Sequence, residues 1–248
     1  VGAVLAPADP ATGWAGGTAQ LLGNWEYRDG ADGLDRVRSW VATSPVALDA
    51  WVIERERLDP LAYAELWVRD GGTLPGTPEH AAMVEAWLAD FAGRGVTAIG
   101  FGYLLLRRAA GSPVLARYER VTHPLPDGLG GHLARALAAA DRLAVLDDDA
   151  LAEARLVAAG DVTEARHHLP GAESPSVIEL RQGAGLARTI EVDPALAALV
   201  GASDGDLTVA QLAAAIADLL EVDADALRAE LLPRVRELVF AGFLGFAA

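Results

Sequence analysis

The sequence predicts an α/β protein built in two parts, and three observations support this prediction. Residues 18–22 and 96–107 are apolar on both faces of an extended chain, as expected of strands that helices cover on both sides. Around them, apolar residues recur every three or four positions, which is typical of amphipathic helices. The second half combines Ala- and Leu-rich helices with two short strands around a glycine-rich loop, which predicts an α+β unit.

Length and composition limit the kinds of protein that fit. A chain of 248 residues with 52% hydrophobic residues can bury a sizeable core, and we expect two domains, residues 1–125 and 126–248. The chain has no cysteine, which excludes disulfides and thiolate chemistry. Its 20 Lys and Arg against 35 Asp and Glu give a formal net charge of -15, whose field repels nucleic acids and anionic membranes.

Targeting and membrane segments are not apparent in the sequence. No apolar run approaches the ~20 residues of a membrane span, and no basic stretch precedes an apolar one at the start. We therefore expect a soluble, cytoplasmic protein without a membrane partner, which the lack of cysteine also fits. The chain starts at Val1 and shows no opening strand with a glycine-rich turn, so we expect it to be part of a longer protein.

The first predicted strand is followed by three residues suited to binding. Residues 18–22 form this strand, and Asn24, Trp25 and Glu26 come after it. Sheets of α/β proteins bind ligands outside the carboxyl ends of their strands, so these three are our candidate substrate-binding residues. The alternative is a loop that leads into a helix and anchors its Trp in the core.

The rest of the first half alternates between helices and strands. Asp59-Pro60 and Thr77-Pro78 each predict a helix start, because Asp and Thr cap free amides and Pro tolerates the first helical position. An earlier helix follows Asp32-Gly33. Three more segments are expected to be strands: residues 51–58 near the sheet edge, residues 96–107 in the interior, and residues 114–121 as an antiparallel partner.

A family resemblance supports this order. Residues 16–26 (GGTAQLLGNWE) resemble the fifth strand of class I S-adenosylmethionine-dependent methyltransferases, specifically an actinobacterial family close to the small-domain and release-factor glutamine methyltransferases. Residues 59–70 (DPLAYAELWVRD) and 231–244 (LLPRVRELVFAGFL) resemble the middle and the end of the same family. The resemblance implies a partial Rossmann-like sheet in which residues 96–107 lie antiparallel between the fifth and sixth strands.

The resemblance covers only the second half of that family. The chain has no Gly-rich cofactor loop and no Asn-Pro-Pro-Tyr/Phe motif. It therefore implies a parent enzyme that methylates a nitrogen of protein or nucleic acid, with Asn24, Trp25 and Glu26 at the rim of the acceptor pocket. We assign no catalytic or cofactor-binding residue, and we expect the chain alone to be inactive and not to bind S-adenosylmethionine. Residues 18–22 would form an apolar sheet edge through which the isolated chain self-associates.

The second half suggests a different class of function. Helices are expected over residues 128–146 and 148–159, after Asp193-Pro194, from Thr208, and from Asp223 or Asp225. Residues 176–182 and 186–192 are expected to form a hairpin. Three helices and a hairpin resemble a winged-helix unit, so the alternative function is a non-enzymatic module that docks a protein or nucleic acid. The last helix mixes acidic and basic residues, whereas DNA-binding helices present a basic face, which favours packing or protein docking.

Other candidate motifs favour structural roles. Gly100-Phe101-Gly102 lies inside an apolar run, so close packing is expected there instead of a nucleotide loop. Glu164, His167 and His168 are metal-ligand types, but adjacent histidines of a strand point to opposite faces, so we predict no metal site.

Overall fold

The computed structural model describes residues 17–109 and 111–247. It is a mixed α/β structure that divides into two compact units, residues 1–123 and 124–248. Within the described ranges, no helix combines the length and the apolar character that crossing a bilayer requires.

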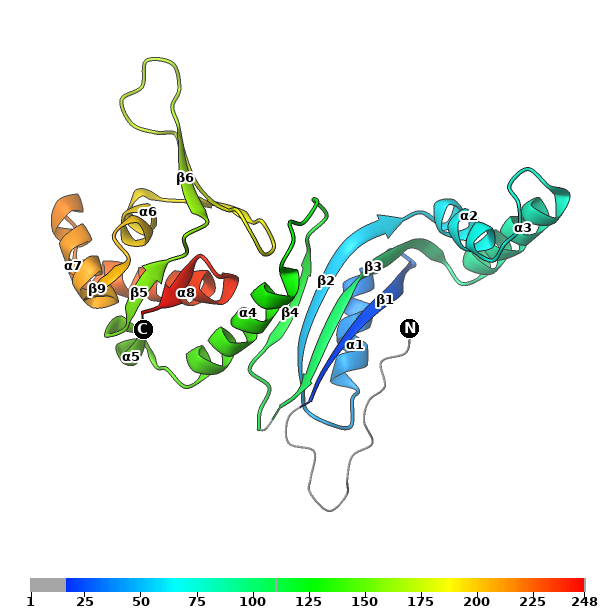
Figure 1. Ribbon diagram of the computed structural model, residues 1–248, viewed down its shortest axis with the longest axis horizontal. Helices are drawn as coiled ribbons and strands as arrows, with labels where there is room; N and C mark the ends of the chain where they lie inside the picture. The colour runs from blue at the N-terminus through cyan, green and yellow to red at the C-terminus, as the bar shows by residue number, and fades with distance from the viewer. Residues whose placement is uncertain (1–16, 110, 248) are drawn as a thin grey trace. The chain divides into compact units, whose positions relative to one another are not determined.

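The first unit is built on a four-stranded sheet in the order β1-β3-β2-β4 (Figure 1). Its strands are β1 (Thr18–Arg28), β2 (Leu48–Leu58), β3 (Val96–Arg108) and β4 (Ala116–Arg120). β3 pairs antiparallel with both β1 and β2, which confirms the predicted interior strand and its position between its two neighbours. β1 and β2 therefore run parallel to each other.

One expectation for this sheet is wrong. Residues 114–121 do not pair with the preceding strand, because β3 is already paired along both edges. β4 pairs instead in parallel with β2, where Asp49 Oδ1 accepts hydrogen bonds from the N–H groups of Val114 (2.6 Å) and Leu115 (3.0 Å). β2 therefore lies next to the edge strand β4, near the sheet edge as predicted, and its residues 49–54 are buried in spite of their charges.

Three helices lie in the described part of the first unit, and the two predicted caps, Asp59 and Thr77, are confirmed. They are α1 (Gly33–Ala42), α2 (Pro60–Asp70) and α3 (Pro78–Gly93), capped by the side chains of Asp32, Asp59 and Thr77. α1 packs with Ala98 of β3, whereas α2 and α3 pack with its neighbour Ile99. Because successive strand residues point to opposite faces, α1 and the α2–α3 pair lie on opposite faces of the sheet.

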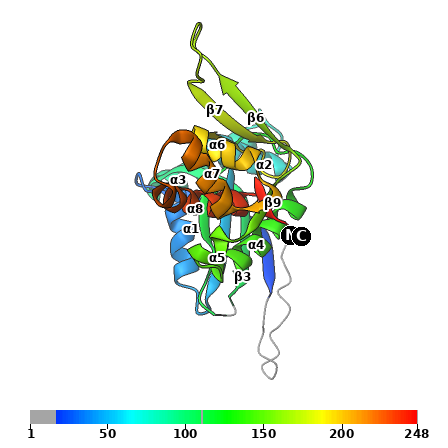
Figure 2. The same cartoon turned by 90° about the vertical axis from the view of Figure 1, so that its left-hand side faces the viewer.

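The second unit contains two antiparallel three-stranded sheets and five helices. One sheet has the order β10-β5-β9 and the other β6-β7-β8, and Figure 2 shows β6 and β7 extending past α6. The strands are β5 (Arg155–Ala158), β6 (Val162–His167), β7 (Val177–Gln182), β8 (Thr189–Val192), β9 (Asp204–Thr208) and β10 (Leu244–Phe246). The helices are α4 (Leu129–Ala144), α5 (Asp148–Ala152), α6 (Pro194–Gly201), α7 (Val209–Leu220) and α8 (Ala224–Ala241).

Local signals predicted most of the second unit. The β7–β8 hairpin and the helix starts at Asp193, Thr208 and Asp223 are confirmed. The helix expected over residues 148–159 ends at Ala152, because the following residues pair as β5 with two distant strands and bury Leu156. Such tertiary pairing overrides the helix propensity of an Ala-rich segment.

Candidate functional site

Asn24, Trp25 and Glu26 lie within β1 and not beyond its end. The prediction that they follow the strand is wrong, because β1 pairs with β3 as far as Arg28. Trp25 is buried on the α1 face, and the alternation of the strand places Asn24 and Glu26 on the opposite face. All three residues nevertheless line one cavity of about 460 Å³.

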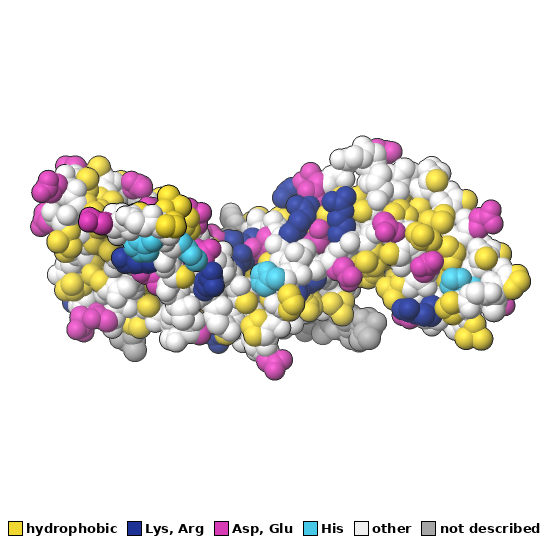
Figure 3. Space-filling view, turned by 90° about the horizontal axis from the view of Figure 1, so that it is seen from above, with side chains coloured by type: hydrophobic (Ala, Val, Ile, Leu, Met, Phe, Trp, Pro, Cys, Tyr) yellow, Lys and Arg dark blue, Asp and Glu magenta, His cyan; other side chains and the backbone are white. Residues whose placement is uncertain are grey.

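Aromatic side chains of α2 and α3 form one wall of this cavity. Tyr63 lies 5.8 Å from Trp87 and 5.9 Å from Phe91, measured between ring centroids. The amide of Asn24 donates a hydrogen bond to the hydroxyl of Tyr63 at 2.9 Å, which joins β1 to this wall. Figure 3 shows hydrophobic side chains gathered over this end of the first unit, on the right of the view.

α1 contributes a second wall to the cavity. Arg36 and Trp40 line it, with the Arg36 guanidinium 5.7 Å from the centre of the Trp40 ring. Trp40 is 45% exposed, so its side chain is accessible from solvent. The cavity is thus rich in aromatic surface with polar groups at its base, the composition typical of small-molecule sites.

Glu26 and Asp90 are the acidic residues that line the cavity, and Glu26 is the one on β1. Its carboxylate accepts a hydrogen bond from Arg28 Nε at 2.7 Å and also pairs with Arg94. Burial acts to raise the pKa of Glu26, but hydrogen bonds from Arg94 and Arg28 outweigh it and hold the pKa below its usual value. Glu26 is therefore ionised at neutral pH and suits hydrogen-bond acceptance better than proton abstraction.

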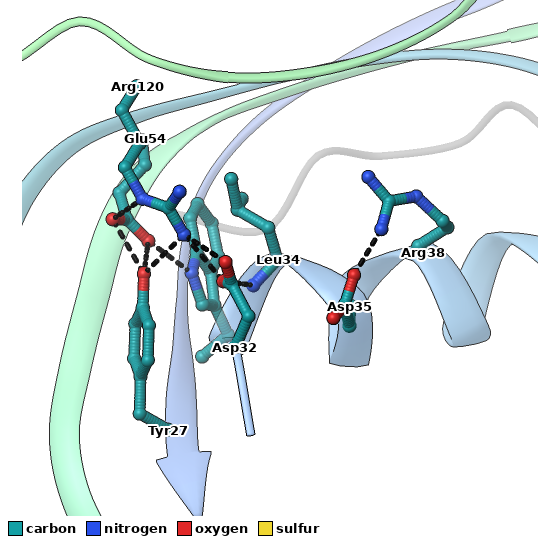
Figure 4. A network of polar contacts seen from close by, with 8 residues as sticks. Tyr27, Asp32, Leu34, Asp35, Arg38, Glu54 and Arg120 are labelled. Atoms are coloured by element: carbon teal, nitrogen blue, oxygen red, sulfur yellow. Dashed lines mark hydrogen bonds and ion pairs between the residues drawn. The ribbon is translucent and has the colours of Figure 1, made fainter. Parts of the chain in front are cut away.

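A buried polar network holds Trp25 in place (Figure 4). Glu54 of β2 is 1% exposed, and its carboxylate accepts hydrogen bonds from Trp25 Nε1 at 2.8 Å, the Tyr27 hydroxyl at 2.6 Å and Arg120 Nε at 3.1 Å. Arg120 also donates to both carboxylate oxygens of Asp32, at 2.5 and 2.6 Å. A buried carboxylate is tolerated only when it is paired in this way, so the network is a fixed support for one side of the cavity.

Burial and the charges in this network shift the pKa values of Tyr27 and Asp32. Burial, followed by the hydrogen bond to Glu54, raises the pKa of Tyr27 to about 12. Burial also acts to raise the pKa of Asp32, but the hydrogen bond from Arg120 outweighs it and lowers the pKa. Tyr27 thus remains a neutral donor and Asp32 an anion over the physiological range.

The sequence did not identify this network. Trp25 and Tyr27 are two residues apart and so share a face of β1, which was one available signal. A carboxylate inside residues 51–58 was a second signal, but its burial depends on pairing with β3 and β4.

Gly100 makes room for the network, since a Cβ there would lie 2.4 Å from both Glu54 Oε2 and Trp25 Nε1. The packing role predicted for Gly100-Phe101-Gly102 is therefore confirmed.

The expected structural role of the second-unit histidines agrees with the contacts that the structure shows. His167 Nε2 lies 3.1 Å from Glu179 Oε2, and Glu164 accepts from Arg166 at 2.5 Å. Within residues 17–109 and 111–247, no three His, Cys, Asp or Glu side chains gather as a metal site would require.

The glycine motifs of residues 100–102 and 128–131 do not form the turn between a strand and a helix that commonly binds nucleotide-like cofactors such as S-adenosylmethionine. Gly100 and Gly102 lie inside β3, and Gly128 to Gly131 open α4 without a strand directly before them. No chemical step through this cofactor is assigned to the residues of this chain.

One comparison with known proteins gives a match. Residues 137–245 match a family model described as Domain of unknown function (DUF7782), a range that runs from α4 to β10 of the second unit. No match was found among the curated proteins. The first-unit cavity lies outside the matched range.

Proposed function

We propose that this chain is the C-terminal part of an S-adenosylmethionine-dependent methyltransferase that acts on a nitrogen of protein or nucleic acid. The observation that carries the proposal is the order β1-β3-β2, with β3 antiparallel between two strands that run parallel to each other. A last strand in this position is what the resemblance of residues 16–26 to class I methyltransferases implies. The sheet is then the end of a Rossmann-like sheet.

The first-unit cavity would shape the pocket for the methyl acceptor. Methyl transfer requires an acceptor lone pair in line with the sulfonium methyl group, so positioning supplies much of the rate. The aromatic wall formed by Tyr63 and Trp87 suits a flat acceptor group, and the ionised Glu26 suits its N–H donors. These groups bind and orient, and the groups that contact the cofactor would come from outside this chain.

The outer edge of β1 is where the rest of such a sheet would attach. Among the described strands, none pairs with this edge, and Leu22 is 81% exposed. An unpaired apolar edge favours the addition of a strand. In the complete enzyme this strand would be the preceding one of the sheet, and in the isolated chain it would come from a second copy.

The test uses the complete product of the gene. We expect it to bind S-adenosylmethionine in calorimetry and to transfer a labelled methyl group to protein or nucleic acid of its own cell. Asn24→Ala and Glu26→Gln should raise the acceptor KM about tenfold, equivalent to one lost hydrogen bond to a charged or polar group, and leave cofactor affinity unchanged. Gln20→Ala is the matched control, because Gln20 lies on the same face of β1 outside the cavity. A complete product that neither binds the cofactor nor transfers methyl groups refutes the proposal.

The alternative, a docking module in the second unit, is favoured by the β7–β8 hairpin and by helices α6, α7 and α8. The charges of α8 favour a protein partner over nucleic acid, because its arginines are neutralised within the chain. Each pairs with an acidic residue: Arg228 with Asp225, Arg234 with Asp193, and Arg236 with Asp148. A mobility-shift assay against salt should therefore show no salt-sensitive nucleic-acid binding, since phosphate contacts weaken steeply as salt rises. A pull-down that recovers one partner specifically would support protein docking.

A further inference from the structure

The second unit contains a cavity of its own, between α4, the end of α8 and β10. Its volume of about 520 Å³ lies within the range of small-molecule sites. Much of the lining is apolar, including Leu244 and Phe246 of β10. Six alanines contribute to it: Ala136, Ala138, Ala139, Ala158, Ala159 and Ala184. The apolar body of a ligand would be in contact with this surface.

A buried hydrogen-bond acceptor lies in the wall of this cavity. Gln182, at the end of β7, is 7% exposed, and its Nε2 donates to the carbonyl of Ala241 at 2.8 Å. This bond fixes the orientation of the amide. Gln182 Oε1 is buried without a hydrogen-bond partner in the described part of the chain. The oxygen has almost no exposed surface, so a ligand N–H or O–H reaches it only where the cavity wall opens slightly. Because a buried acceptor without a partner is unfavourable, a ligand that makes this contact would gain affinity.

Two arginines give the cavity a positive charge. Arg135 and Arg142 of α4 both line it and are seven residues apart, so they lie on one face of the helix. Arg142 lies 3.6 Å above the centre of the Phe246 ring, and Arg135 is exposed. Asp161 is the acidic residue of the lining, and its Oδ2 already accepts from the N–H of Ala184 at 2.9 Å. In a chain of net charge -15, this local excess of cations favours an anion.

We propose that this cavity binds a small organic anion with an apolar body, whose anionic group contacts Arg135 and Arg142 and whose N–H or O–H group donates to Gln182 Oε1. The ligand class follows from the three kinds of surface that the cavity combines. Apolar walls alone would accept any hydrophobic compound, and arginines alone would accept inorganic anions. This site does not depend on the methyltransferase proposal, because the residues that form it all belong to the second unit.

Three probes of similar size separate these features. Indole-3-acetate has the apolar body, the carboxylate and the N–H donor, 1-naphthaleneacetate lacks the donor, and 3-methylindole lacks the carboxylate. Binding to the full 248-residue chain would be followed by NMR of alanine methyl groups, because the six lining alanines report directly on the cavity. We expect indole-3-acetate to shift these methyl signals and to bind about tenfold more tightly than either comparison probe.

Substitutions then assign the contacts. Gln182→Leu should weaken indole-3-acetate about five- to tenfold and leave 1-naphthaleneacetate unchanged, which also shows that the variant cavity is still folded. Arg135→Gln should weaken both acetates several-fold and leave 3-methylindole unchanged. Arg228→Gln is the matched control, because it removes the same charge from α8 at a position outside the cavity.

Three results would overturn the proposal. The first is the absence of any shift in the lining alanine methyls at millimolar indole-3-acetate. The second is equal affinity for all three probes, which would show an unselective apolar cavity. The third is an equal effect of Arg135→Gln and Arg228→Gln on acetate binding, which would show attraction by overall charge instead of contact.

Discussion

Removing the buried carboxylate of Glu54 should destabilise the first unit strongly. Glu54→Ala leaves Trp25 Nε1 and the Tyr27 hydroxyl, on side chains that are 2% and 4% exposed, without their acceptor. Each stranded donor costs about 1–3 kcal/mol, so we expect a loss of about 4 kcal/mol in the free energy of unfolding. Arg120 adds little to this loss, because its side chain is 44% exposed and keeps Asp32 as a partner.

The sequence provides a selective probe for this measurement. The six Trp and four Tyr of the chain all lie within residues 1–123, so Trp fluorescence reports on the first unit alone. In urea, a loss of about 4 kcal/mol corresponds to a midpoint lowered by about 2 M when the slope is near 2 kcal/mol/M. Glu54→Gln keeps one acceptor oxygen, so its free energy of unfolding should fall by about half as much as that of Glu54→Ala.

Glu56→Ala is the matched control for Glu54→Ala. It removes a carboxylate from the same strand two residues further on, where the side chain is exposed, and should change the free energy of unfolding by about 0.5 kcal/mol or less. Equal midpoints for the two variants would refute the view that the buried carboxylate stabilises the first unit.

Three further predictions follow from the same unit. Because the folded pKa of Tyr27 is about 12 against an ordinary 10.0, its contribution to stability is present below pH 10 and is lost as the pH rises through 12. The chain contains no lysine, but burial also raises the pKa values of Tyr63 and Tyr118 in the same unit. Tyr27→Phe should therefore reduce the fall of the Trp-detected urea midpoint in this window without abolishing it, and an unchanged fall would contradict the assignment. Gly102→Ala would place a Cβ 2.0 Å from the carbonyl oxygen of Ile53 and should cost about 3 kcal/mol by the same assay, whereas Gly111→Ala, which meets no atom within 4 Å, should be nearly neutral. The isolated chain should give no heat with S-adenosylmethionine and should associate with concentration in sizing experiments, less so after Leu22→Lys. Micromolar cofactor binding by a monodisperse monomer would show that the proposed position of this chain in the methyltransferase fold is wrong.

Local chemistry made much of this fold predictable. Some features depend only on a few neighbouring residues, so they can be predicted from short stretches of sequence. They are the caps at Asp59, Thr77 and Asp193 and the two-sided apolar pattern of β3. β9 and β10 were missed because each is defined by pairing with β5, which lies far away in the sequence. Their own residues carry no clear two-residue alternation, so their extended structure depends on the partner strand.

The candidate site was predictable only in part. Asn24, Trp25 and Glu26 were identified from their position after an apolar strand, and they do line one cavity. The aromatic wall could not be predicted in the same way, because Tyr63 and Trp87 reach the cavity only through the packing of α2 against α3. The pairing of Glu26 with Arg94, 68 residues away, depends on the same packing.

Trp25 connects the stability of the first unit with the shape of its cavity. Its ring lines the cavity, while its N–H group is held by the buried Glu54. A change at Glu54 should therefore lower both the free energy of unfolding and the affinity for any compound bound against the ring, although Glu54 contacts no such compound. Loss of binding in a Glu54 variant is thus no sign of a catalytic role. Only variants such as Asn24→Ala, whose side chain is exposed and outside the buried network, separate contact with the acceptor from support of the cavity wall.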